Sequence, residues 1–171
     1  AILLCLSGCT THSSKAIKAI SALRAGDTVR VLAWTEEMKQ SRSDQQLGHI
    51  ECGRVKMLTG DFEGSRAEFA TVIDRMIEET EAGPVVKFGS MGATVVASTI
   101  ADDTVRPYEP APYELIQTLH YQTLNYLFAG DREGAAVEAR RTVFAQDQIA
   151  DHYAKEIEKA QADADKSHEK A

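Results

Sequence analysis

The sequence predicts an all-α protein built from antiparallel helix hairpins that stack as a short solenoid. Composition favours helices, because aromatic residues make up only 6% of the 171 residues while Ala, Glu, Lys, Arg and Gln are plentiful. The second observation is a Gly-Asp pair that ends an apolar run three times, at Gly26-Asp27, Gly60-Asp61 and Gly130-Asp131. The third is the spacing of these glycines, which are 34 and then 70 residues apart, the latter close to twice 34. One helix–turn–helix unit therefore recurs along the chain.

Each Gly-Asp pair has the chemistry of a helix-to-helix turn. Glycine adopts the left-handed conformation that closes a helix, and aspartate caps the first free amides of the next one. We expect helices over residues 14–25, 28–42, 44–59, 62–82, 112–129 and 132–164. Gly83-Pro84 ends the fourth helix and Pro112 opens the fifth. Along the second helix we expect an apolar stripe of Val29, Leu32, Ala33 and Met38, with Trp34 beside it.

A 34-residue period with this turn is typical of tetratricopeptide (TPR) repeats. In the second unit Gly53 takes the small-residue position of the first helix, and Phe62 and Phe69 take the aromatic positions of the second. In the third unit Tyr126 and Ala135 match the pattern. The first unit matches less well. The alternative is a generic bundle of helical hairpins whose turns use Gly-Asp.

The N-terminus has the features of a targeting signal. Residues 1–6 are apolar, and Leu6-Ser7-Gly8-Cys9 matches the lipobox of bacterial lipoprotein signal peptides. We therefore expect residues 1–8 to be the remnant of a signal peptide and Cys9 to carry the lipid that anchors the protein to the membrane. Because Thr10 replaces the aspartate that commonly retains such proteins in the inner membrane, we expect the periplasmic face of the bacterial outer membrane. A stray apolar terminus with a chance cysteine is the alternative.

The charge of the chain argues against nucleic acid as a partner. The formal net charge is −7, and the chain has no basic cluster. We assign residues 9–150 to a TPR-like helical domain and residues 151–171 to a polar helical tail. Cys52 lies in an apolar periodic segment, which favours a small buried helix residue over a reactive thiol.

Residues 83–113 form a divergent insertion that does not match a repeat. Its first half, residues 85–98, mixes β-branched residues with small ones, and its larger residues also recur at helical spacing, so helix and strand compete, and we favour a short, closely packed helix. The glycines at 89 and 92 are not followed by the Gly-Lys-Ser/Thr of a phosphate loop. Three of the four prolines fall within residues 107–112, which predicts a stiff extended connector.

Together these features resemble a family of uncharacterised bacterial outer-membrane lipoproteins with TPR-like repeats. The resemblance covers most of the chain between about residues 40 and 145, besides the lipobox. The segments that carry it are Glu51–Arg54, Leu58–Phe62, Pro107-Tyr108, Tyr113-Glu114, Leu124–Asp131 and Val137–Arg141. The resemblance implies an envelope location and an interaction role rather than a reaction.

The sequence contains no catalytic or metal-binding motif that we recognise. The five histidines are far apart and lack the spacing of zinc ligands. Carboxylate pairs such as Glu36-Glu37 are adjacent in sequence and diverge on a helix, whereas acid–base catalysis needs opposed groups. We therefore expect no catalytic residue, no metal and no cofactor. The charged run of Glu138, Arg140 and Arg141 is typical of solvated helix pairs, or of a contact with the connector at 107–113.

The function that these features favour is a lipid-anchored periplasmic scaffold that binds other envelope proteins during envelope assembly or maintenance. Stacked hairpins line a groove with their first helices. The expected groove residues are Ile50, Arg54, Met57, Gln117, His120, Tyr121 and Leu124. The alternative is an accessory or catalytic domain that acts on cell-wall material or a small ligand through residues 85–113.

Overall fold

A computed structural model of the chain describes residues 12–80, 83–87 and 107–169. The predicted lipobox around Cys9 and residues 88–106 of the predicted insertion lie outside the described residues. The elements are α1 (His12–Arg24), α2 (Thr28–Gln40), α3 (Gln45–Leu58), α4 (Phe62–Met76), β1 (Ile77–Thr80), β2 (Gly83–Val86), α6 (Pro112–Phe128) and α7 (Arg132–Glu169). The all-α prediction is confirmed in the sense that the described chain is mostly helical, with a single small strand pair.

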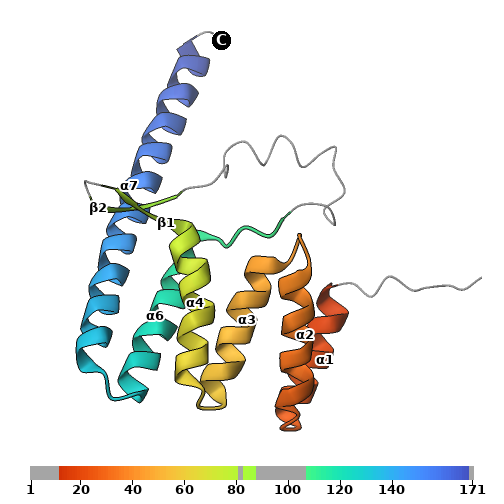
Figure 1. Cartoon of the computed structure of the whole chain (residues 1–171). Helices are drawn as coiled ribbons and strands as arrows, with labels where there is room; N and C mark the ends of the chain where they lie inside the picture. The colour runs from red at the N-terminus through yellow and green to blue at the C-terminus, as the bar shows by residue number, and fades with distance from the viewer. Residues whose placement is uncertain (1–11, 81–82, 88–106, 170–171) are drawn as a thin grey trace, which may run out of the picture.

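Neighbouring helices pack against each other in chain order, as Figure 1 shows. Helix α2 packs on α3, α3 on α4, and α6 on α7. Helix α4 packs directly on α6, although residues 77–111 separate them in the sequence. Helix α6 therefore takes the place next to α4 in the stack. No helix among the described residues has both the length and the apolar character to cross a membrane.

The three Gly-Asp turns have the same geometry, which confirms their prediction. The turn glycines have φ values of 75°, 84° and 80°. In each turn the aspartate amide donates to a carbonyl five residues earlier at 2.8–2.9 Å, and the aspartate carboxylate accepts from the amide three residues later at 2.8–3.2 Å. These bonds satisfy backbone groups that a helix end leaves free. The residue five positions after each glycine is buried; these residues are Val31, Ser65 and Ala135.

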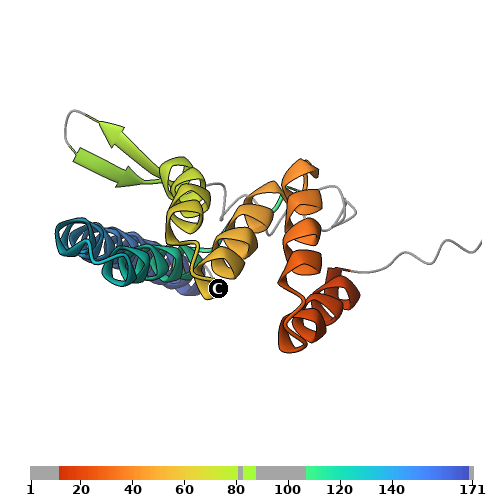
Figure 2. The same cartoon turned by 60° about the horizontal axis from the view of Figure 1, so that its bottom comes forward.

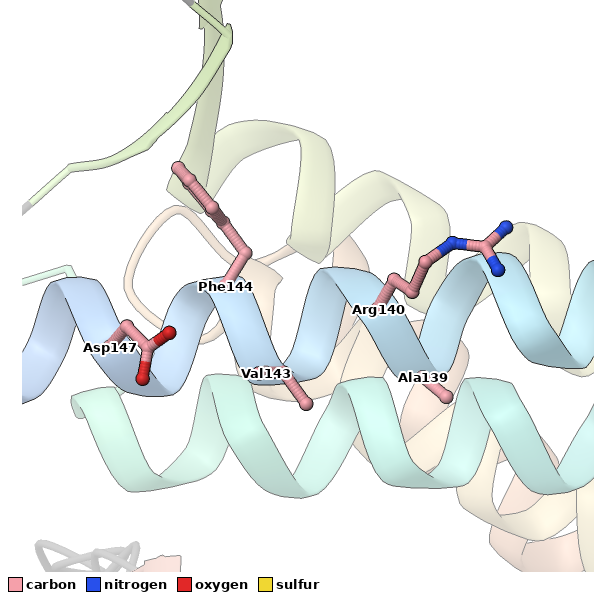
Figure 3. A pocket seen from close by; sticks show the side chains of 5 residues that line it. All are labelled: Ala139, Arg140, Val143, Phe144 and Asp147. Atoms are coloured by element: carbon pink, nitrogen blue, oxygen red, sulfur yellow. The ribbon is translucent and has the colours of Figure 1, made fainter.

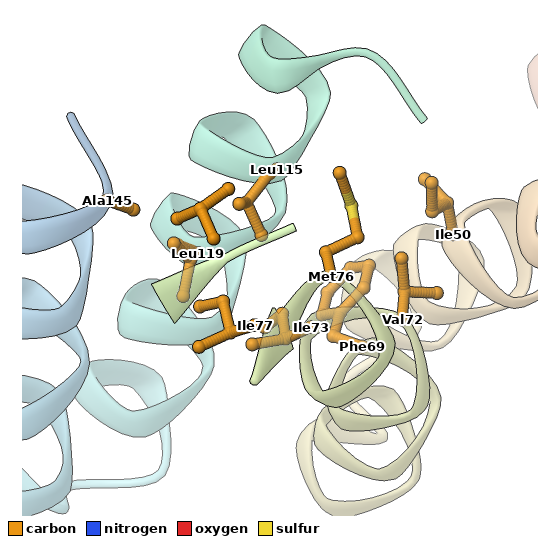
Figure 4. Close-up of a cluster of buried hydrophobic side chains, with 10 residues drawn as sticks. Ile50, Phe69, Val72, Ile73, Met76, Ile77, Leu115, Leu119 and Ala145 are labelled. Carbon is orange, nitrogen blue, oxygen red and sulfur yellow. The ribbon is translucent and has the colours of Figure 1, made fainter. Parts of the chain in front are cut away.

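The main core lies where α3, α4, α6 and α7 meet (Figure 4). Its largest fully buried side chains come from α4 and α6: Phe69, Val72, Ile73, Leu115 and Leu119. A second, smaller cluster of Ala22, Val31 and Val55 joins α1, α2 and α3. The stack thus has its best-packed part between α4 and α6 rather than at its N-terminal end.

The fourth helix is shorter than the sequence predicts, because α4 ends at Met76 instead of Ala82. The chain then forms an antiparallel hairpin in which Ile77 pairs with Val86 and Thr80 with Gly83. Ile77 and Val86 are both buried in the main core, so the strand pair covers the end of α4 with apolar side chains. The short helix favoured over residues 85–98 is therefore wrong at Val85 and Val86, and its remaining residues are outside the described part.

The apolar stripe expected along α2 is confirmed at Met38 and, as partly buried residues, at Leu32 and Trp34, but it is wrong at Val29. Val29 is 77% exposed, and the buried residues are Val31, Thr35 and Met38. The face that is buried follows from where α3 and α1 pack, and Thr35 satisfies its hydroxyl by donating to the carbonyl of Leu32 at 2.8 Å. A polar residue thereby occupies an interior position that hydropathy alone assigns to solvent.

Candidate functional site

The candidate partner-binding site lies where α3 and α6 come together, and its centre is Tyr121. The Tyr121 ring stacks on buried Phe69, with centroids 6.0 Å apart and planes at 18°. Gln117, one turn earlier on α6, donates from Nε2 to the Tyr121 hydroxyl at 3.0 Å. The guanidinium of Arg54 on α3 lies 5.9 Å from the ring centroid, which is within cation–π distance. Tyr121 is therefore held from three sides while it stays partly exposed.

Arg54 is itself positioned by a neighbour on its own helix. Its Nη1 atom lies 2.9 Å and 3.2 Å from the two carboxylate oxygens of Glu51. Such an exposed i,i+3 pair contributes only a few tenths of a kcal/mol to stability. The ion pair with Glu51 mainly orients the Arg54 guanidinium, which points towards Tyr121 on α6.

The structure brings only some of the predicted groove residues together on one surface. Arg54, Gln117 and Tyr121 form one contacting group. The residues that flank this group on the same two helices are Met57, His120 and Leu124, of which Leu124 is 38% exposed. Ile50 is only 8% exposed and belongs to the main core with Phe69, so its side chain does not line a surface groove.

An apolar extension of this face was missed by the sequence analysis. Phe128, at the end of α6, is 60% exposed, and its ring lies 5.6 Å from that of Phe62 on α4. On α1, the exposed residues Ile17 and Ile20 precede their turn glycine by nine and six residues, the same offsets as Tyr121 and Leu124. Counting back from each turn glycine finds these positions, whereas hydropathy alone assigns them to the core.

A second polar cluster was also missed, and it surrounds the buried carboxylate of Glu68 on α4. Lys56 and Lys39 place their ammonium groups 2.6 Å and 2.9 Å from Oε1, and His49 Nδ1 lies 2.8 Å from Oε2. Burial by itself raises the pKa of Glu68, but the bonds from Lys56, Lys39 and His49 outweigh it and lower the pKa to about 2. The cluster is an ion-pair network that connects α2, α3 and α4.

Part of this cluster has ligand atoms close enough to hold a metal ion. One atom each from Glu36, Cys52 and Glu68 lies within 4.8 Å of the others. The Lys39 ammonium already bridges the two carboxylates, at 2.7 Å from Glu36 and 2.9 Å from Glu68, and so occupies the place of a cation. Burial raises the pKa of the Cys52 thiol, which keeps its proton; Sγ lies 3.5 Å from Glu68 Oε1 and 3.7 Å from Glu36 Oε1, so its single hydrogen is donated to one carboxylate at a time. Cys52 is thus the buried helix residue that the sequence predicts.

The charged run on α7 joins two helices. Glu138 is buried, and its carboxylate accepts from Arg141 Nη1 at 3.1 Å. Arg141 also lies 3.8 Å from Asp74 on α4. The i,i+3 pair that the sequence predicts is therefore present, but it is not fully solvated, because Glu138 is buried, and the described contact of Arg141 outside α7 is with Asp74 of α4 rather than with the connector.

Comparison of the chain with protein-family models, curated proteins and solved structures gives no significant match in any of the three.

Proposed function

We propose that the protein is a helical-repeat scaffold of the bacterial envelope that binds another protein across the exposed face of α3 and α6. The observation that carries the proposal is the contact of Arg54 with the ring of Tyr121, which places an aromatic side chain and a guanidinium together on a partly exposed surface. Tyrosine and arginine are enriched among the residues that dominate protein–protein binding energy. Binding, rather than catalysis, is the function that this set of side chains supports.

The support beneath Tyr121 favours binding for a second reason. Phe69 and Gln117 restrict the ring before any partner arrives, at 6.0 Å between ring centroids and 3.0 Å to the hydroxyl. A side chain that is already ordered loses less conformational entropy when a complex forms. Exposed Leu124 and Phe128 continue the same helix towards its C-terminus and provide apolar contacts. A helix or an extended segment laid along α6 is the kind of ligand that fits this pattern.

The location of the scaffold follows from the sequence of the N-terminus. We place it at the periplasmic face of the outer membrane, anchored through acyl chains on Cys9, because Leu6-Ser7-Gly8-Cys9 matches a lipobox. Labelling with a fatty-acid analogue should mark the wild-type protein but not Cys9→Ser. Equal labelling of both, or recovery of the wild-type precursor product in the soluble fraction, would refute the anchor.

The binding face is tested by in-cell crosslinking of the full precursor followed by mass spectrometry of the captured proteins. The double variant Arg54→Glu/Leu124→Asp should lose capture of the dominant envelope protein while its helical signal and melting temperature stay unchanged, because both side chains are exposed. The matched control Arg42→Glu/Val29→Asp makes the same charge changes at exposed positions outside this face. Equal capture by the two double variants would overturn the assignment of the face.

A further inference from the structure

In the hairpin of α3 and α4, one face of α4 packs against the next helix, α6. The equivalent face of α7 is exposed. In α4, Phe69 and Ile73 lie nine and thirteen residues after the turn glycine, and both are fully buried in the core shared with α6. The residues at the same offsets in α7 are Ala139 and Val143, and Val143 is 57% exposed. The hollow on this face is lined by Ala139, Arg140, Val143, Phe144 and Asp147 (Figure 3).

This face continues along the part of α7 that projects beyond the other helices (Figure 1). Val143, Ala150 and Ile157 are seven residues apart, and Ala139, Tyr153 and Ala160 lie at the intervening positions of the same heptads. This spacing is that of a coiled-coil seam. The seam, called the α7 stripe below, consists of Ala139, Val143, Gln146, Ala150, Tyr153, Ile157 and Ala160, all of them exposed.

We propose that the α7 stripe pairs, in antiparallel orientation, with the α7 stripe of a second copy of this chain. An antiparallel pair centred between Ala150 and Tyr153 sets Ala150 of one copy opposite Tyr153 of the other. The same register sets Val143 opposite Ala160. In these two layers a large side chain faces a small one, which is the complementarity that close helix packing requires, and in the layer between them Ile157 faces Gln146. The stripe is therefore complementary to itself about a two-fold axis.

A parallel pair lacks this complementarity. It would place Ala150 against Ala150 and Tyr153 against Tyr153, which leaves a gap in one layer and crowds the next. It would also align two acidic segments, since residues 151–169 carry six carboxylates against three lysines. The antiparallel pair instead lays this segment against residues 132–150, which carry three arginines and three carboxylates. Electrostatics and packing thus favour the same orientation.

The length of the stripe also indicates a second α7 as the occupant. The stripe spans 22 residues, which is about 33 Å of helix. Helices α3 and α6, which open the two well-packed hairpins, have 14 and 17 residues, whereas α7 has 38. A long helix segment without packing partners has marginal stability in water, and a second copy supplies the apolar contact that the projecting half of α7 lacks within the described chain.

Sedimentation of the 171-residue chain tests the pairing. We expect a mass twice the 18.7 kDa of one chain. Ile157→Glu should weaken the dimer about 100-fold or more, because the pair would bury a charged carboxylate in the seam in place of an apolar side chain. Ile157 is 58% exposed, so the variant should keep the helical content of the wild type. The control Lys159→Gln makes the same charge change on the opposite side of α7 and should leave the dimer intact. A monomer at all concentrations, or equal loss in both variants, would overturn the proposal.

Orientation is tested with single cysteines introduced at facing positions, in chains where Cys5 and Cys9 are replaced by serine. A mixture of Val143→Cys and Ala160→Cys should form a mixed disulfide on mild oxidation, while each variant alone should crosslink to itself poorly. Efficient self-crosslinking of Val143→Cys would instead show a parallel pair and refute the antiparallel arrangement. Neither measurement depends on the partner-binding face of α3 and α6, so failure of one proposal is distinguishable from failure of the other.

Discussion

Asn125 on α6 donates from Nδ2 to the hydroxyl oxygen of Ser65 on α4 across 2.7 Å, in a fully buried contact. The same hydroxyl donates to the carbonyl oxygen of Gly53 on α3, also at 2.7 Å. One hydroxyl thereby joins the two helices of one hairpin to the first helix of the next. Because residues 77–111 separate α4 from α6 in the chain, this relay joins segments that local structure alone does not connect.

Removal of the relay should destabilise the stack. Ser65→Ala leaves the Gly53 carbonyl and the Asn125 amide without this partner in the interior, and we expect a loss of about 1–3 kcal/mol in the free energy of unfolding. Urea denaturation measures this loss. Thr71→Ala on the same helix is the control, since exposed Thr71 bonds only locally to the Ala67 carbonyl at 3.1 Å and should change stability by under about 0.5 kcal/mol. Similar losses in both variants would contradict the relay.

The close approach of α3 to α4 at Gly53 requires glycine. A Cβ atom at position 53 would lie 2.6 Å from Cε1 of Phe69, inside contact distance of a fully buried ring. Gly53→Ala should therefore cost about 1–3 kcal/mol, the usual range for overpacking a core. The double variant Gly53→Ala/Phe69→Leu should lose less than the sum of the two single variants, as measured by a thermal double-mutant cycle. Strict additivity would show that the two positions do not compete for space.

The Glu68 network should make stability depend on acid. The folded-state pKa of Glu68 is about 2, below its ordinary value of 4.5. The carboxylate therefore contributes its full stabilisation above about pH 5 and loses it as the pH falls from 5 towards 2. Glu68→Gln should lower the free energy of unfolding by roughly 3 kcal/mol at pH 7, at 1.36 kcal/mol for each pKa unit. The difference between wild type and variant should shrink at pH 3. If wild type and Glu68→Gln differed in unfolding free energy by the same amount at pH 7 and pH 3, the lowered pKa of Glu68 would be contradicted.

The segment before α6 should loosen when Glu114 is removed. Its carboxylate accepts from the Ala111 amide at 2.7 Å and from the hydroxyl of Tyr108, and the Tyr108 amide donates to the Ser43 carbonyl at 2.6 Å. Burial, and then the Glu114 carboxylate, raise the pKa of the Tyr108 phenol, which keeps its proton. Glu114→Ala should cost about 1 kcal/mol, as loss of a helix cap does, and should speed hydrogen exchange at the Tyr108 amide. Glu109→Ala, at an exposed position, should leave that exchange rate unchanged.

Local signals explain why the helical part of the fold is predictable. A turn glycine at φ near 80° and a capping aspartate act within a few residues of each other, so the turns at Gly26, Gly60 and Gly130 follow from the sequence alone. Pro112 at the first turn of α6 is predictable for the same reason. The exposure of Arg54 and Tyr121 follows from their offsets within a repeating unit, whereas their contact depends on how α3 meets α6.

The sequence by itself determined the helices, their turns and the burial of Cys52, because each depends on neighbours in the chain or on a simple apolar period. The tertiary structure alone decided three features: the strand pair after Met76, the burial of Val31 and Thr35 on α2, and the Glu68 network. Ile77 is buried in the main core together with Val86, its partner on the other strand, and Lys39 meets Glu68 across 29 positions of sequence. Such contacts form only when helices meet in space, so no local pattern specifies them.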